Sequence, residues 1–121
     1  MSVRTVGSKF VELCRQGKNF DVMRTMYAPD IVSVEGDGQE TAGQGPVIKK
    51  SEDWVSDKNF NGETVAGPFF NGANPDQFVV FFTLDITPKA TGQRITREEV
   101  GIYTVKNDKI VREQFFYDGA H

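Results

Sequence analysis

Histidine and cysteine are almost absent from this chain of 121 residues, and their scarcity excludes several kinds of site. The single histidine is the last residue, His121, and the single cysteine is Cys14. A nucleophile activated by histidine would depend on a terminal side chain, and a metal site built from several histidines is impossible. An internal disulfide is excluded as well, which is typical of a reducing compartment. Acid–base chemistry must therefore come from carboxylates, tyrosines or lysines.

Dense positive charge and long apolar runs are also missing. The net charge is −3, and the densest basic run, at 48–50, is soon followed by acids. We therefore expect neither nucleic acid nor a membrane surface as a partner. No apolar stretch approaches the ~20 residues that cross a bilayer, and the N-terminus lacks the apolar core of a signal peptide. We expect a cytoplasmic protein, and since no phosphate loop, dinucleotide fingerprint or metal cluster is present, no cofactor and no metal.

Phenylalanine is common, with ten copies in a chain of the length of one domain, 1–121. These rings favour a core built from phenylalanine and are also compatible with a phenylalanine-lined cavity. Hydrophobic spacing predicts a helix over 3–16 that ends at Gly17, a short second helix with Tyr27 on its apolar face, and a third that opens at Pro46.

Extended segments alternate with and then follow the helices. The expected strands cover 31–35, 64–70, 77–87, 95–105 and 109–118. The segment 77–87 is continuously apolar, which predicts burial on both faces. This order predicts an α+β domain with three helices packed on one face of a curved, mostly antiparallel sheet that encloses a conical pocket. The pocket is either open or filled by phenylalanines, for which the candidates are Phe10, Phe69, Phe81 and Phe115.

The turn at 106–108 decides which side chains of the last two strands face that pocket. A loop of two residues pairs Val105 with Ile110, whereas a loop of three, with Asp108 left-handed, pairs Val105 with Lys109. We prefer the second, because aspartate tolerates the left-handed region. It places Glu99, Gly101 and Tyr103 on one face with Glu113, Phe115 and Tyr117, and it points Asp118 away; the first register places Arg112, Gln114 and Phe116 there instead.

The opposite face of these strands carries Val100, Ile102 and Phe116. An apolar sheet face of this kind needs a cover, and a second copy of the chain can supply it. We therefore expect a homodimer formed through the sheet face.

Three stretches resemble a known family: "MYAPDIVSVEGDG" (26–38), "GQGPVIKKSEDW" (43–54) and "EEVGIYTVKNDKIVREQFFYD" (98–118). They look like the SnoaL-like branch of the nuclear transport factor 2-like superfamily, which also contains ketosteroid isomerases and polyketide cyclases. The resemblance implies a cystatin-like cone, commonly a dimer, with a pocket at its wide end. Because this fold hosts enzymes, binding modules and transport factors, the resemblance indicates the fold better than the reaction.

The resemblance also implies a catalytic carboxylate. In ketosteroid isomerases the general base lies eight residues after the tyrosine of the "YA" pair, and that count from Tyr27 reaches Glu35. The isomerases' oxyanion donors do not carry over, since their positions fall at Phe10 and Gly101. Steroid isomerisation is therefore not expected. The late aspartate of polyketide cyclases has only Asp118 as a counterpart, and the preferred register turns it away from the pocket.

Glu35 and Glu99 are the candidate catalytic residues. Glu35 is either a pocket carboxylate with a raised pKa or a solvated residue at a strand end. Strand alternation sends either Glu98 or Glu99 inward, and an inward Glu99 would form an acid–base pair with Glu35 or a salt bridge with Lys50. The candidate substrate-binding residues, each of which can also be ordinary core or surface, are Phe10, Tyr27, Lys50, Trp54, Tyr103, Phe115 and Tyr117.

Two functions fit these residues. The first is an isomerase, cyclase or lyase that acts on a hydrophobic, carbonyl-bearing molecule, with Glu35 as the base and Tyr103, Tyr117 or Lys50 as donors. The second is a non-catalytic module of the same fold that binds an apolar ligand or a protein partner. Missing oxyanion donors favour the module, whereas two inward carboxylates favour the enzyme, because burying them costs stability unless they serve a purpose.

Overall fold

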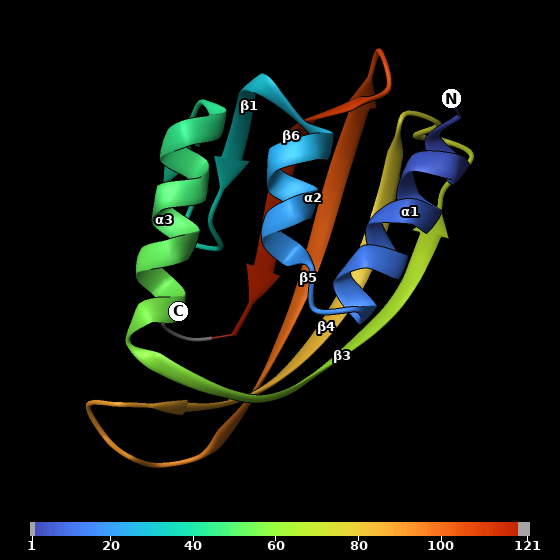
Figure 1. Ribbon diagram of the computed structural model, residues 1–121. Coiled ribbons are helices and arrows are strands. Elements are labelled where there is room, and N and C mark those ends of the chain that lie inside the picture. The colour runs from blue at the N-terminus through green and yellow to red at the C-terminus, as the bar shows by residue number, and fades with distance from the viewer. Residues whose placement is uncertain (1, 119–121) are drawn as a thin grey trace.

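The computed structural model describes residues 2–118, which form three helices and one six-stranded sheet (Figure 1). The helices lie side by side on one face of the curved sheet, so the predicted α+β architecture is confirmed. The elements in chain order are α1 (Val3–Arg15), α2 (Asn19–Met26), β1 (Tyr27–Val34), β2 (Glu40–Ala42), α3 (Gln44–Ser56), β3 (Lys58–Phe70), β4 (Gln77–Pro88), β5 (Ile95–Lys106) and β6 (Lys109–Tyr117).

The sheet has the strand order β2-β1-β6-β5-β4-β3. Strands β3 to β6 form an antiparallel meander, while β1 returns to pair with β6 in parallel, so the sheet is mixed. This return brings the first strand beside the last one and pairs Ser33 with Glu113. Two polar residues that lie 80 positions apart in the chain thus become neighbours on the inner face.

The helices begin and end close to the predicted residues. The Ser2 hydroxyl accepts the Thr5 N–H at 3.1 Å and caps α1, and Gly17 follows its end with φ +74°. Tyr27 was predicted on the second helix, but its backbone is extended and it opens β1. This strand therefore begins earlier than the predicted 31–35, and an irregularity in its pairing between Tyr27 and Val32 accommodates Pro29, which has no N–H to donate.

Two strand predictions are wrong in an informative way. β3 starts at Lys58 rather than at 64, because its polar first half pairs with the end of β4. β4 is not buried on both faces: its residues alternate between buried and half-buried along the strand. The helices cover one face only, so the apolar side chains of Val79 and Phe81 lie on the uncovered face. The short strand β2 was not predicted.

The hairpin between β5 and β6 combines features of both predicted registers. Its loop has two residues, Asn107 and Asp108, both with positive φ, and Val105 pairs with Ile110. The preference for a loop of three residues was therefore wrong. A bulge at Val111 then adds one residue to β6, so that Tyr103 pairs with Glu113. The bulge restores the face that we preferred, with Glu99, Gly101, Tyr103, Glu113, Phe115 and Tyr117 on one side.

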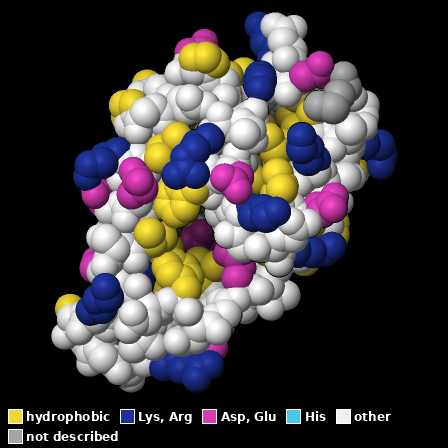
Figure 2. Space-filling view, viewed as in Figure 1, with side chains coloured by type: hydrophobic (Ala, Val, Ile, Leu, Met, Phe, Trp, Pro, Cys, Tyr) yellow, Lys and Arg dark blue, Asp and Glu magenta, His cyan; other side chains and the backbone are white. Residues whose placement is uncertain are grey.

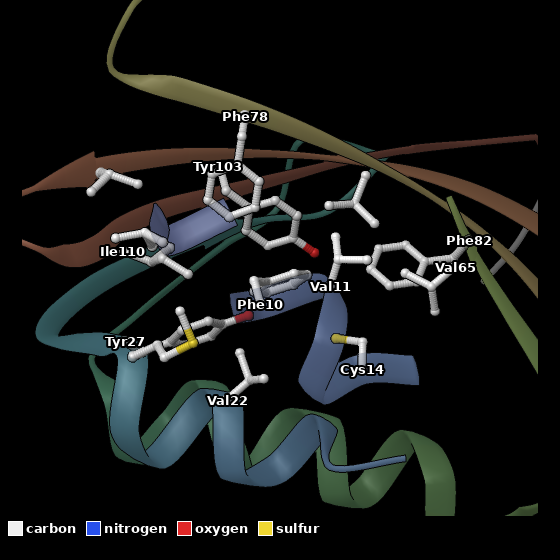
Figure 3. Packing of buried hydrophobic residues seen from close by; sticks show 14 of the residues in the cluster. Phe10, Val11, Cys14, Val22, Tyr27, Val65, Phe78, Phe82, Tyr103 and Ile110 are labelled. Atoms are coloured by element: carbon white, nitrogen blue, oxygen red, sulfur yellow. The ribbon is translucent and has the colours of Figure 1, made fainter. Parts of the chain in front are cut away.

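The core lies between the helices and the inner face of the sheet (Figure 3). Phe10 of α1 is its centre: its ring centroid lies 4.4 Å from that of Tyr103 and 5.4 Å from that of Phe78. Val22 of α2 and Tyr27 pack on the other side of Phe10. Within residues 2–118 no helix is long and apolar enough to span a bilayer.

The outer face of the sheet leaves large apolar side chains in solvent. Phe116 is 50% exposed and Phe69 is 54% exposed, while Val100 and Ile102 are half-buried. Dimerisation through this face stays a prediction.

Candidate functional site

A cavity of about 980 Å³ lies between the helices and the inner face of the sheet. On the face shown in Figure 2, hydrophobic side chains surround a hollow that has an acidic side chain at its bottom. Phe69 and Phe81, which were candidates to fill the cavity, do not line it, and it is open. All the predicted site residues line it: Phe10, Tyr27, Glu35, Lys50, Trp54, Glu99, Tyr103, Phe115 and Tyr117. Asp118 does not.

Glu35 follows β1 and is held by two donors from other elements. Lys50 of α3 donates to its Oε1 at 2.6 Å, and the Tyr117 hydroxyl of β6 donates to its Oε2 at 3.0 Å. Lys50 also donates to Ser33 Oγ at 2.7 Å. The salt-bridge partner of Lys50 is thus Glu35 rather than Glu99. Glu35 lines the cavity, as one of the two alternatives predicted, but it does so as part of an ion pair, which neither alternative included.

Glu99 enters the same cavity from β5 in a different environment. Glu99 is only 7% exposed. Burial, followed by the negative charge of Glu35, raises its pKa from 4.5 to about 7, although Arg97 opposes the shift. Near neutral pH this carboxyl is present in both protonation states, which is the condition in which a side chain can accept a proton and return it.

Tyr103 lies four residues beyond Glu99 on the same face of β5, with Gly101 between them on that face. Its ring stacks on Phe78 with 5.1 Å between centroids, and it is 2% exposed. A Cβ atom at Gly101 would lie 2.7 Å from the Tyr103 hydroxyl oxygen, so the tyrosine leans along the strand over Gly101, in the direction of Glu99. The pKa of Tyr103 is raised well above 10 by burial, which keeps the hydroxyl protonated as a donor.

The hydroxyl of Tyr103 is directed at the cavity without a partner among residues 2–118. The hydroxyl oxygen opens onto the cavity, so it is available as a hydrogen-bond donor to a molecule held there. A polar atom of a bound molecule in the cavity would satisfy it.

Glu113 and Ser33 extend the polar cluster into the interior, and the sequence analysis did not name them as site residues. Glu113 is 2% exposed and accepts a hydrogen bond from the hydroxyl of Tyr27. Burial raises its pKa, while hydrogen bonds from Tyr27 and Ser33 and the charge of Lys50 lower it. Because lysine only donates, Ser33 accepts from Lys50 and gives its own proton to Glu113. The alternation of Glu113 with Phe115 and Tyr117 was the available signal.

Glu63 of β3 is a second residue that the sequence analysis missed. It lines the cavity and its pKa is raised by burial, while a hydrogen bond from Asn19 opposes the shift. The predicted strand began at 64, so Glu63 was assigned to a loop. Cys14, also in the lining, is a buried thiol whose pKa is raised to about 12, first by burial and then by Glu63, so it is not a nucleophile.

Comparison with known proteins decides the family. A family model described as a SnoaL-like domain matches residues 1–117. The chain belongs to the SnoaL-like family. No match to a curated protein was found.

Solved structures support the same assignment for this SnoaL-like protein. A Mesorhizobium loti protein provisionally named a SnoaL-like polyketide cyclase is 40% identical, with a TM-score of 0.90 over 97% of this chain and 100% of its own. A provisionally named isomerase from Bacillus subtilis (12% identity, TM-score 0.74, 96% and 86% covered) shares the fold. So does a nuclear transport factor 2-like protein of unknown function from Burkholderia xenovorans (15%, TM-score 0.71, 98% and 84%). The fold and cavity are those of a small-molecule-binding protein.

Proposed function

We propose that this SnoaL-like protein is a cofactor-independent proton-transfer enzyme, of the isomerase, cyclase or lyase kind, that acts on a hydrophobic molecule with a carbonyl group. One observation carries the proposal. A carboxyl group with a pKa of about 7, Glu99, and a protonated hydroxyl without a partner among the described residues, Tyr103, are presented side by side on one strand inside a largely apolar cavity. A proton acceptor and an oxyanion donor are the two groups that such a reaction needs.

In the proposed reaction, the Glu99 carboxylate takes a proton from the carbon next to the substrate carbonyl. The electron pair of the broken C–H bond forms a C=C bond, and the carbonyl π electrons move to the oxygen, which becomes an enolate. The hydroxyl of Tyr103 donates a hydrogen bond to this oxygen. Glu99, now protonated, returns the proton to the same carbon or, where a neighbouring C=C bond of the substrate extends the enolate to a dienolate, to the γ-carbon, which restores the enzyme. The aromatic lining limits water, which would otherwise compete for the hydrogen bond.

Glu35 has a supporting role in this proposal, in contrast to the expectation that it is the base. Its carboxylate already accepts from Lys50 on one oxygen and from Tyr117 on the other. Its negative charge is also one cause of the raised pKa of Glu99. We therefore assign the proton transfer to Glu99, and to Glu35 the orientation of Lys50 and Tyr117 at the cavity wall.

The test uses 2-tetralone, a bicyclic ketone with acidic C–H bonds next to its carbonyl. Exchange of these protons in heavy water is followed by NMR with wild type, Glu99→Gln and Tyr103→Phe. We expect wild type to accelerate exchange above the buffer rate, and each variant to reduce this catalysis by roughly 100-fold or more. Glu98→Gln is the matched control, because Glu98 is the neighbouring glutamate but is exposed.

Two results would overturn the proposal. Equal exchange by the Glu99→Gln and Glu98→Gln variants would remove Glu99 from the reaction. Binding of 2-tetralone without any catalysed exchange would favour the alternative function, a module that holds its ligand without transforming it.

A further inference from the structure

We propose that the natural ligand of the cavity is a hydrophobic molecule with a positively charged amine. This inference rests on the proposed function only for the location of the site, because it concerns the charge that the same cavity selects.

The first observation is the charge of the lining. Among the described residues, the cavity is lined by six acidic side chains and one lysine, which are Glu35, Asp37, Asp53, Glu63, Glu99, Glu113 and Lys50. The lysine is already paired with Glu35. Asp53 has a cation of its own in Lys49, at 2.5 Å on the exposed side of α3. Acidic groups therefore clearly outnumber cationic ones around the space that a ligand would occupy.

The second observation is how deeply this charge is buried. Glu99 and Glu113 are 7% and 2% exposed. Glu63 lines the same cavity from a more exposed position on β3, and desolvation is still the largest cause of its raised pKa. Glu35 and Glu63 also raise the pKa of Glu99 by their charge. Mutually repelling carboxylates in apolar surroundings are costly unless a cation compensates them. A ligand ammonium placed among them would remove both the repulsion and part of the cost of burial.

The third observation is the aromatic character of the same walls. The lining includes Phe10, Phe20, Tyr27, Trp54, Phe60, Phe82, Tyr103, Phe115 and Tyr117. Aromatic rings together with carboxylates are the standard surroundings of an organic cation. At the edge of the cavity, the Lys58 ammonium already lies 4.3 Å from the centroid of the Trp54 ring. The lining can therefore hold the hydrocarbon part of a ligand and its charge together.

The hydroxyl of Tyr103 is an independent feature of the cavity that favours a ligand with a polar group. The Tyr103 residue is 2% exposed, and its hydroxyl opens onto the cavity, where it complements a carbonyl oxygen. A substrate with both a carbonyl and an amine would satisfy the hydroxyl and the carboxylates at once. The amine would also favour the proposed chemistry, since a nearby positive charge stabilises the enolate.

Binding of such a cation should depend on pH through Glu99. The charged groups that face Glu99 are Glu35 after β1, Lys50 of α3, Glu63 of β3 and Glu113 of β6, with Arg97 on its own strand. A bound ammonium favours the ionised form of Glu99, so binding near neutral pH releases a proton. The affinity should therefore rise as the pH increases through about 7.

The experiment compares three ligands that share one bicyclic frame. Calorimetry at about pH 8 measures the Kd of 2-aminotetralin (a cation), 2-tetralol (neutral) and tetralin-2-carboxylate (an anion). We expect the amine to bind roughly 10-fold more tightly than the alcohol, and the carboxylate to bind most weakly. The amine should lose up to roughly 10-fold in affinity between about pH 8 and pH 6.

Variants of the lining glutamates test whether these carboxyl groups, rather than the cavity in general, cause the preference for the amine. Glu99→Gln and Glu63→Gln should weaken binding of the amine and leave the alcohol unchanged, while the control Glu98→Gln should change neither. In Glu99→Gln the pH dependence of the amine should disappear. Equal affinity for amine and alcohol, or tightest binding of the carboxylate, would overturn the inference.

The outcome is also distinguishable from failure of the proposed function. Catalysed exchange of 2-tetralone without a preference for the amine would refute the charge inference alone. A preference for the amine without catalysed exchange would refute the catalytic role alone.

Discussion

Two glutamates face one cavity in this protein, and their settings are opposite. Glu35 is held by the Lys50 ammonium and the Tyr117 hydroxyl, and it is 21% exposed. Glu99 is 7% exposed and shares its surroundings with other carboxylates, which together with burial raise its pKa to about 7. The residue type is the same, so the contrast between the two carboxyl groups comes from what surrounds each of them.

The comparison shows that position in a family motif and suitability for proton transfer are separate properties. The count from Tyr27 led to Glu35, whose carboxylate is bonded to the Lys50 ammonium and the Tyr117 hydroxyl, and we propose that it holds these two side chains in place. The carboxyl group that the environment prepares for proton exchange lies on β5, 64 positions later in the chain.

The largest expected effect tests the cost of keeping Glu99 buried. Its pKa is about 7 in the folded protein, against 4.5 for the unperturbed group, so the folded state binds the extra proton. The contribution of this group to stability is present below about pH 4.5 and is lost as the pH rises through 7. The isosteric variant Glu99→Gln should avoid this loss, which amounts to as much as about 3 kcal/mol.

Urea unfolding at about pH 4.5 and pH 8 measures this difference for wild type, Glu99→Gln and the control Glu98→Gln. The Glu99→Gln variant should gain stability relative to wild type at the higher pH. If all three proteins showed the same dependence on pH, Glu99 would not be a buried carboxyl with a raised pKa.

Each glutamate region also contains a tyrosine that packs against a glycine, and the buried pair should be the more sensitive one. A Cβ atom at Gly101 would lie 2.7 Å from both Cε2 and the hydroxyl oxygen of Tyr103. The ring cannot move aside, because Phe10 and Phe78 pack against it. Gly101→Ala should therefore destabilise the fold by about 1–3 kcal/mol and remove the catalysed exchange. Gly72→Ala is the control, since nothing lies within 4 Å of its added Cβ, and equal stability of the two variants would contradict this packing.

A smaller effect is expected at the Glu35 region. A Cβ atom at Gly36 would lie 2.9 Å from Cζ of Tyr117, but this ring is half-buried at the edge of the cavity and can swing outward. Gly36→Ala should cost about 1 kcal/mol, the order of the lost hydrogen bond between Tyr117 and Glu35. Urea unfolding compares it with Gly101→Ala. A larger loss in Gly36→Ala would reverse the proposed ranking of the two regions.

The smallest effect on the cavity is expected from the outer face of the same strands. Phe116 is 50% exposed on the face opposite Phe115 and Tyr117, and we propose that a second copy of the chain covers it. Phe116→Ser should shift a dimer toward monomer in light scattering and leave the exchange of 2-tetralone unchanged. A monomeric wild type at micromolar concentration would contradict the homodimer.

Much of the fold could be predicted because it depends on local patterns. Helical spacing located α1 and α3, and Pro46 lies in the first turn of α3 as expected. The face of β6 was also correct, although the turn was not, because the two-residue loop and the bulge at Val111 compensate each other. A bulge leaves little trace in composition, so the sequence indicated which face of β6 is inward but not the loop length and the bulge that produce it.

The site was predictable only where neighbours along the chain determine it. Alternation indicated that either Glu98 or Glu99 points inward, and the lining includes Glu99. The contact of Glu113 with Ser33 depends on the parallel pairing of β1 with β6, which joins distant segments. The way Tyr103 leans over Gly101 depends on its stacking with Phe78 and Phe10. Both contacts arise from tertiary packing, which the hydrophobic periodicity of the sequence does not predict.

The most direct test of the account is an NMR titration of the glutamate side-chain carboxyl carbons, with Glu99→Gln to assign the resonance of Glu99. We predict that this resonance titrates with a midpoint near 7. A midpoint near 4.5 would mean that Glu99 is an ordinary solvated carboxylate, and it would contradict both the proposed proton transfer and the contrast with Glu35.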